Sequence, residues 1–116
     1  MSKKITKAIK KKIEEGGTKF DQDKPRLSLI PPEAIVEVGK VFTFGASKYG
    51  ENNWRKGFKW TRLISAALRH IMAFSMGEDM DPESGLNHLA HASACLFMLL
   101  ALFSKKDLDD RYKSKE

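Results

Sequence analysis

Residues 84 to 104 read Ser84-Gly-Leu-Asn-His-Leu-Ala-His-Ala-Ser-Ala-Cys-Leu-Phe-Met-Leu-Leu-Ala-Leu-Phe-Ser104, a stretch without a formal charge. Its apolar residues occupy nearly every side of a helix, which is typical of a buried helix, and Ser84 can cap the first turn. The stretch is long enough to cross a membrane, but Asn87, His88 and His91 disfavour that interpretation. We therefore expect a buried helix from Ser84 to about Ser104.

Two amphipathic patterns precede this stretch. The first begins at Pro31-Pro32, because proline favours the backbone conformation of a helix start. It is expected to end near Phe44, because Gly45 follows and glycine commonly terminates helices. The second begins near Trp60 and ends near Gly77. No β-strand pattern of useful length is present, so the sequence predicts an all-α fold, a helical bundle of three main helices. The third helix is too apolar for a small monomer, and we expect oligomerisation to complete the bundle.

The chain divides by composition into three parts. Residues 1–17 form a lysine-rich arm with Ile5, Ile9 and Ile13 at helical spacing, residues 18–104 form the helical domain, and residues 105–116 form a charged tail. Residues 18–30 lack sustained periodicity and are expected to form an ordered loop. The expected apolar anchors of this loop are Leu27, Leu29 and Ile30.

Length and composition limit the possible classes of protein. A chain of 116 residues with 41% apolar residues fits one domain and excludes two catalytic domains. The one cysteine, Cys95, excludes an internal disulfide and a cysteine-only zinc site, and is expected to pack in the core. The chain opens with lysines and no apolar signal segment, so a cytoplasmic location is expected. Most of the +6 net charge lies in the arm, which disfavours nucleic acid as a partner.

Four carboxylates lie close together between the second and third expected helices. They are Glu78, Asp79, Asp81 and Glu83. Oxygen-only clusters of this density suit Mg²⁺ or Mn²⁺, which can then bridge phosphate oxygens. The same residue types also cap helices, so both interpretations remain open.

Three histidines could face one space. His88 and His91 lie three residues apart on one face of the third expected helix, and His70 follows Arg69 on the second. Histidines at this spacing can bind a transition metal or a phosphate. Histidine in an apolar helix is also often a buried residue bonded to a carbonyl or a carboxylate.

The loop expected over residues 45–59 combines cations and aromatic rings, which together suit the phosphates and the base of a nucleotide. The candidate binding residues here are Lys48, Trp54, Arg55, Lys56 and Trp60, with Lys24 and Arg26 upstream. The alternative is a solvated loop with one tryptophan packed inward. A further pair, Glu33 and Glu37, shares a helix face and is either a ligand pair or solvent-facing.

Several ordered blocks make the sequence similar to a known family. The blocks are Lys19-Phe-Asp-Gln-Asp-Lys-Pro-Arg-Leu-Ser-Leu-Ile-Pro-Pro-Glu33, Phe44-Gly-Ala-Ser-Lys-Tyr-Gly50, Asn53-Trp-Arg-Lys-Gly57, Arg69-His70 and Gly77-Glu-Asp-Met-Asp-Pro-Glu-Ser-Gly-Leu-Asn-His-Leu-Ala-His91. Over residues 18–103 the chain resembles the phage-borne dATP/dGTP diphosphohydrolase N-terminal domain family. That family looks like a branch of the all-α, MazG-like nucleoside triphosphate pyrophosphohydrolases.

The resemblance implies an oligomeric, magnesium-dependent enzyme that splits a nucleoside triphosphate into monophosphate and pyrophosphate. The chain departs from the MazG-type signature, a paired-glutamate motif and a Glu-x-x-Asp. Arg69-His70 and His88-x-x-His91 stand on the helices where those acids are expected. Such a site could bind phosphates well and hydrolyse them poorly.

Three hypotheses follow. In the first, a purine (deoxy)nucleotide pyrophosphohydrolase uses Glu78, Asp79, His88 and His91 for catalysis, the four clustered carboxylates for Mg²⁺ or Mn²⁺, and the basic and aromatic residues above, with Arg69 and His70, for substrate. In the second, a non-catalytic phage protein in the host cytoplasm sequesters a nucleotide-type immune signal in the same pocket without a metal. In the third, an interaction module contacts nucleic acid through its lysine arm.

Overall fold

The computed structural model describes residues 16–113. The part of the predicted lysine-rich arm that covers residues 1–15 lies outside them. Three α-helices make up the domain: α2 (Pro32–Tyr49), α3 (Trp60–Ser75) and α4 (His88–Ala101). Three short 3₁₀ turns accompany them: η1 (Leu27–Leu29) before α2, η2 (Asn53–Lys56) between α2 and α3, and η3 (Lys106–Leu108) after α4. Residues 16–113 contain no β-strand, only an isolated bridge between Met80 and Asn87, so the all-α prediction is confirmed.

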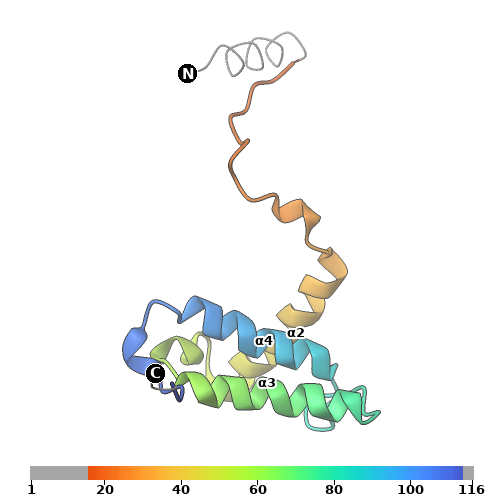
Figure 1. Ribbon diagram of the computed structural model, residues 1–116. Helices are drawn as coiled ribbons and strands as arrows, with labels where there is room; N and C mark the ends of the chain where they lie inside the picture. Colours follow the sequence, from red (N-terminus) through yellow and green to blue (C-terminus); the bar gives the residue numbers. More distant parts are fainter. Residues whose placement is uncertain (1–15, 114–116) are drawn as a thin grey trace.

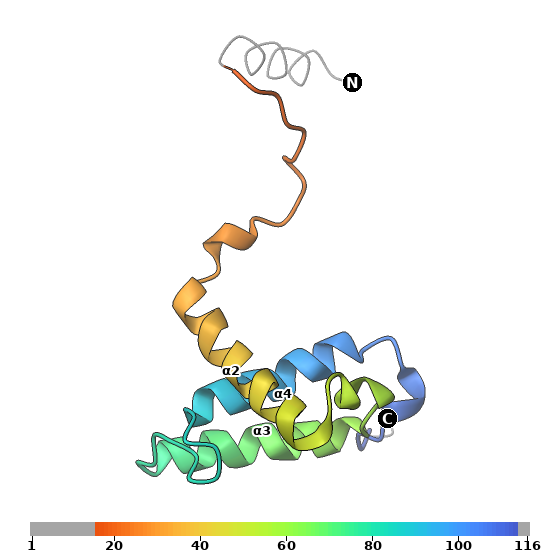
Figure 2. The same cartoon turned by 180° about the vertical axis from the view of Figure 1, so that it is seen from behind.

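The three helices pack through small side chains. Helices α3 and α4 lie side by side, and α2 crosses α4 (Figures 1 and 2). Between α3 and α4 the buried residues are Ala67, Ala92 and Cys95. Between α2 and α4 they are Val38, Val41, Ala90 and Ala94. Small side chains let helix backbones approach closely, and this brings the three helices around one shared space.

Two of the predicted helix boundaries are wrong. Helix α2 passes through Gly45 and ends at Tyr49, five residues beyond the predicted end near Phe44. Gly50 follows it with a φ of 95°, which is accessible mainly to glycine. Helix α4 begins at His88 instead of Ser84, because the Asn87 side chain caps it by accepting a hydrogen bond from the Leu89 amide. The predicted loop over residues 45–59 therefore starts at Gly50.

Helix α4 is not buried on every side within the single chain. Its inner face carries alanines, Cys95 and His88, while larger apolar side chains point outward in the single chain. The exposed ones on or next to α4 are Leu89, Leu96, Phe97, Leu100 and Phe103. The expected anchors Leu27, Leu29 and Ile30 are also exposed, and their segment extends away from the helices (Figure 1). None of the described helices is both long and apolar enough to traverse a bilayer.

The described part of the predicted charged tail packs against the start of α3. Both carboxylate oxygens of Asp110 accept hydrogen bonds from Thr61, from its amide at 2.9 Å and its hydroxyl at 2.6 Å. Lys105 Nζ donates to the Arg55 carbonyl at 3.0 Å. The Asp110 carboxylate thus caps α3 from a distant part of the sequence, since Lys59 at the N-cap position makes no side-chain capping bond.

Candidate functional site

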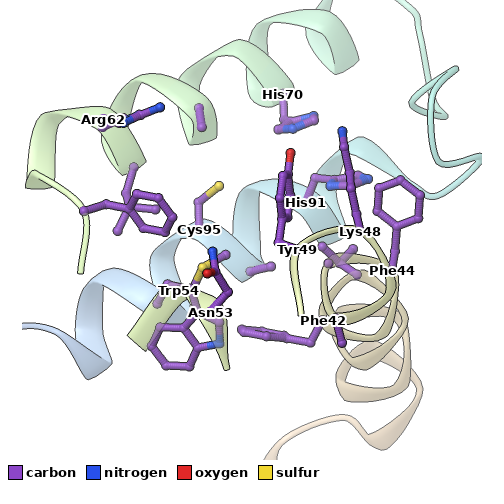
Figure 3. A pocket seen from close by; sticks show the side chains of 18 of the residues that line it. Phe42, Phe44, Lys48, Tyr49, Asn53, Trp54, Arg62, His70, His91 and Cys95 are labelled. Carbon is purple, nitrogen blue, oxygen red and sulfur yellow. The ribbon is translucent and has the colours of Figure 1, made fainter. Parts of the chain in front are cut away.

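A cleft of about 580 Å³ lies between α2, the segment that follows it, α3 and α4. This volume is within the usual range for a small-molecule site. Its two ends differ in chemistry (Figure 3). Phe42, Asn53 and Trp54 line one end, which we call the aromatic end. Lys48, His70 and His91 line the other, where Phe44 and Tyr49 lie beside Lys48.

The aromatic end is built by α2 and η2. Phe42 of α2 meets Trp54 edge to face, with ring centroids 5.9 Å apart and an interplanar angle of 64°. Asn52 adopts the left-handed conformation at a φ of 59°, which turns the chain into η2 and brings Trp54 back toward α2. The Arg55 guanidinium carbon lies 4.5 Å from the Trp54 ring centroid. One side of Trp54 is therefore covered by Arg55 and its edge by Phe42.

Three imidazole rings gather at the other end of the cleft, and we call them the histidine cluster: His70 and His91, which line it, and His88 behind them. His70 Nδ1 and His88 Nδ1 lie 2.8 Å apart. The rings of His70 and His91 stack, with centroids 4.6 Å apart and an interplanar angle of 9°. His91 Nε2 lies 2.6 Å from the Ser84 hydroxyl oxygen. The three rings come from α3 and from the first turn of α4, which the packing of those two helices brings together.

The four clustered carboxylates point to different partners. Glu78 Oε1 accepts a hydrogen bond from His88 Nε2 at 2.7 Å. Asp81 Oδ1 accepts from the amides of Glu83 at 2.7 Å and Ser84 at 3.1 Å. Glu83 pairs with Lys48 of α2, and Asp79 is exposed. The structure thus brings Glu78 and Asp81 to the histidine cluster and leaves Asp79 away from it.

Burial controls the protonation of this end of the cleft. It lowers the pKa of both His70 and His91 below the usual value, and the neighbouring histidines lower it further, so both rings are neutral at pH 7. Burial opposes ionisation of Asp81, but the amides of Ser84 and Glu83 lower the pKa of this carboxyl overall. The result is neutral imidazole next to ionised carboxylate, a combination that can accept a proton or bind a cation.

Residues 14–111 match the family described as dATP/dGTP diphosphohydrolase, N-terminal. The chain belongs to this family. A protein of Salmonella phage PMBT28, named dATP/dGTP diphosphohydrolase, is 44% identical over 96 residues, which are 82% of this chain and 33% of that protein. The chain thus spans about a third of the length of the relative that it matches. No solved structure matches it.

The structure places about half of the predicted site residues at the cleft. Those that line it are Lys48, Trp54, Arg69, His70, Asp81, Glu83 and His91. His88 lies behind them, 4% exposed, and reaches the cleft only through its contact with His70.

The remaining predicted residues lie elsewhere. Trp60 is wrong as a substrate-binding residue, because it is 2% exposed and stacks on Phe103 at a centroid distance of 5.6 Å. Lys24 and Arg26 lie on the extended segment before α2, away from the cleft (Figure 1). Arg55 and Lys56 are exposed and outside the cleft lining. Of the pair on α2, Glu37 is bound to Lys40 at 2.7 Å, and neither Glu33 nor Glu37 lines the cleft.

Sequence reasoning missed several cleft residues of this family member. Phe42, Phe44 and Tyr49 of α2 and Arg62 of α3 line the cleft. Two signals could have found them. Arg62 and Arg69 are seven residues apart and so share a face of α3, and continuation of α2 past Gly45 places Tyr49 on the same helix as Phe42.

Proposed function

We propose that this domain binds a purine deoxynucleoside triphosphate in the cleft and hydrolyses it to the monophosphate and pyrophosphate. The observation that carries the proposal is the contrast between the two ends of the cleft: apolar rings and the Asn53 amide at one, and imidazole, carboxylate and cation at the other. The name of the phage relative, a dATP/dGTP diphosphohydrolase, supports this choice of substrate. The chain spans only part of that relative, so activity of the domain by itself is the point to be tested.

The base would lie at the aromatic end. Phe42 and Trp54 provide flat apolar surface there, and the Asn53 side chain can both donate and accept hydrogen bonds. The phosphates would then reach toward α3, where Arg62 and Arg69 line the same cleft. Guanidinium groups suit phosphate because their paired N–H groups match two of its oxygens.

A magnesium site made by the four clustered carboxylates does not fit the structure. Mg²⁺ requires oxygen ligands in near-octahedral order. Glu78, Asp81 and Glu83 instead bond to an imidazole, to two amides and to Lys48, respectively. We therefore assign no step of the reaction to Mg²⁺ held by these four residues.

His91 is the proposed proton acceptor of the reaction. It lines the cleft, and its lowered pKa keeps the ring neutral at pH 7. A water molecule would attack the α-phosphorus and pass its proton to His91, while the bond from that phosphorus to the bridging oxygen breaks and pyrophosphate leaves. General-base catalysis of this kind contributes about 10²- to 10⁴-fold in rate, so His91→Gln should lower kcat by that factor and change KM little.

The test is a nucleotide panel, incubated with the full chain with and without divalent metals. Bound and free nucleotides are then separated by ion-exchange chromatography. Conversion of dGTP or dATP to its monophosphate is the expected result. Unchanged nucleotide recovered from heat-denatured protein would contradict hydrolysis and support the sequestering alternative, with the same cleft as its binding site.

We further propose that the domain is a homo-oligomer. Large apolar side chains stay exposed on α4 and on α3, where Leu68, Ile71 and Met72 share a face. The segment before α2 also exposes Leu27 and Leu29 and makes no packed layer with its own helices. A second copy would cover these surfaces with equivalent surfaces of its own. A solution mass equal to one chain would contradict this proposal.

A further inference from the structure

We propose that His70, His88 and Asp81 bind a divalent first-row transition-metal ion at the histidine cluster, with Glu78 orienting His88. This ligand set differs from the four carboxylates that the sequence suggested. It does not depend on hydrolysis, because metal binding is measured on the protein without nucleotide.

The spacing of the donor atoms suits one ion. His70 Nδ1 and His88 Nδ1 are 2.8 Å apart, and Asp81 Oδ2 lies 3.8 Å from His70 Nδ1. One ligand atom from each of the three residues lies within 4.8 Å of the other two. Metal bonds of about 2.0–2.2 Å separate neighbouring ligand atoms by roughly 3.0–3.5 Å, so small side-chain shifts suffice to complete the site.

Glu78 fixes the orientation of His88. A carboxylate only accepts, so His88 Nε2 carries the proton in its 2.7 Å bond to Glu78 Oε1. In the neutral ring this leaves the lone pair on Nδ1, which faces His70. Metal-binding histidines commonly donate their second ring nitrogen to a carboxylate in this way. Without a metal, this lone pair accepts a hydrogen bond from His70 Nδ1–H, and a bound ion would take the place of that proton between the two nitrogens.

The loop that carries Asp81 holds the carboxylate in position. Its Oδ1 is used by the amides of Glu83 and Ser84, which leaves Oδ2 on the side of His70. The same loop is closed by the Asp81 amide bonded to the Leu86 carbonyl at 2.8 Å, and the His88 amide donates to the Asp79 carbonyl at 2.9 Å. Asp81 and His88 are therefore positioned by one closed loop at the start of α4.

The donor types determine the class of metal. Two imidazole nitrogens and one carboxylate oxygen suit Mn²⁺, Fe²⁺, Co²⁺ or Zn²⁺, whereas Mg²⁺ prefers oxygen alone. Three protein ligands leave coordination positions free for water or a phosphate oxygen. Both His70 and Asp81 line the cleft, so those positions face the space in which we place the nucleotide.

The test is a titration of chelator-stripped, tag-free protein with Co²⁺, followed by visible absorption and by calorimetry. We expect one Co²⁺ per chain with the spectrum of nitrogen and oxygen ligation. His70→Gln and Asp81→Asn should lose this binding, while Asp81→Asn keeps an oxygen for the two amides. Circular dichroism of each variant shows that its helices are retained.

Glu78→Gln separates a metal site from a packing cluster. Its side chain is 54% exposed, so the fold tolerates the change, and Co²⁺ affinity should fall about 10- to 100-fold. The matched control is Asp79→Asn, an exposed neighbour in the same loop, which should leave the affinity unchanged. Equal losses in both variants, full affinity in His70→Gln, or Mg²⁺ binding as tight as Co²⁺ would overturn the proposal.

Discussion

The loop between α3 and α4, residues 76–87, and the segment between α2 and α3, residues 50–59, differ in how their charged groups are used. In the first, Glu78, Asp81 and Glu83 all bond to other groups of the protein. In the second, Arg55 and Lys56 are exposed, and the Arg55 side chain bonds within the segment, to Asn52 Oδ1 at 3.2 Å, beside Trp54, which reaches the cleft. Both regions are rich in charged and aromatic residues. Only the hydrogen bonds and ion pairs of the folded chain show which of these side chains have a fixed position.

The difference shows two uses of functional side chains. A side chain that is bonded within the protein holds its partner in place, whereas a side chain exposed at the cleft can contact a ligand. Glu78 orients His88 by accepting its hydrogen bond. Asp81 is held by two backbone amides, with its second oxygen toward His70. Trp54 keeps part of its surface for a ligand. The two tryptophans of the chain allow this distinction to be tested directly.

The largest expected effect is on stability, in Trp60→Ala. Trp60 is 2% exposed and stacked on Phe103, so its removal should lower the free energy of unfolding by about 3–5 kcal/mol, measured by denaturant titration. Trp54→Ala is the matched change at the cleft. It should cost less stability but weaken nucleotide binding, since stacking of a base is worth about 1–3 kcal/mol. A larger loss of stability in Trp54→Ala would contradict the assignment of the two residues.

An intermediate effect is expected for the arginines. Arg69 lines the cleft, and a charge-assisted bond to phosphate is worth about 1.5–3 kcal/mol. Arg69→Ala should therefore raise the Kd for dGTP about 10- to 100-fold, measured by calorimetry. Arg55→Ala removes a cation from the exposed side of Trp54 and should change the Kd less. Equal effects would mean that the phosphates lie over η2 instead of α3.

The smallest expected effect is the pH dependence of stability. Burial lowers the pKa of His70 and His91 in the folded protein, so on acidification the unfolded chain takes up these protons first. Stability should be unaffected well above pH 6.5 and should fall as the pH decreases from the unfolded pKa, about 6.5, toward the folded values. His91→Gln should flatten this decline in thermal unfolding curves recorded from pH 7.5 to 5. If the decline of stability with decreasing pH were as steep in His91→Gln as in the unchanged protein, another group would be taking up the protons.

Part of this protein follows from the sequence alone. Helical spacing of apolar residues is a local property, and it gave the all-α class and the approximate positions of α2, α3 and α4. The ordered sequence blocks identified the family, and the match over residues 14–111 agrees with them. Residue types at short spacing also identified His70, His91, Lys48 and Trp54, all of which line the cleft.

The rest depends on which distant residues meet. Trp60 shares a helix face with Leu63 and Ala67, a local signal of burial that Trp54 lacks, but its stacking partner Phe103 lies more than forty positions later and is found only in the folded chain. The four carboxylates share one loop, but their roles depend on His88, Lys48 and the loop's own amides. His70 and His88 meet only because α3 packs against α4. Helix positions depend on residues close together in the sequence, whereas hydrogen-bond partners and contacts between distant residues depend on how the helices pack.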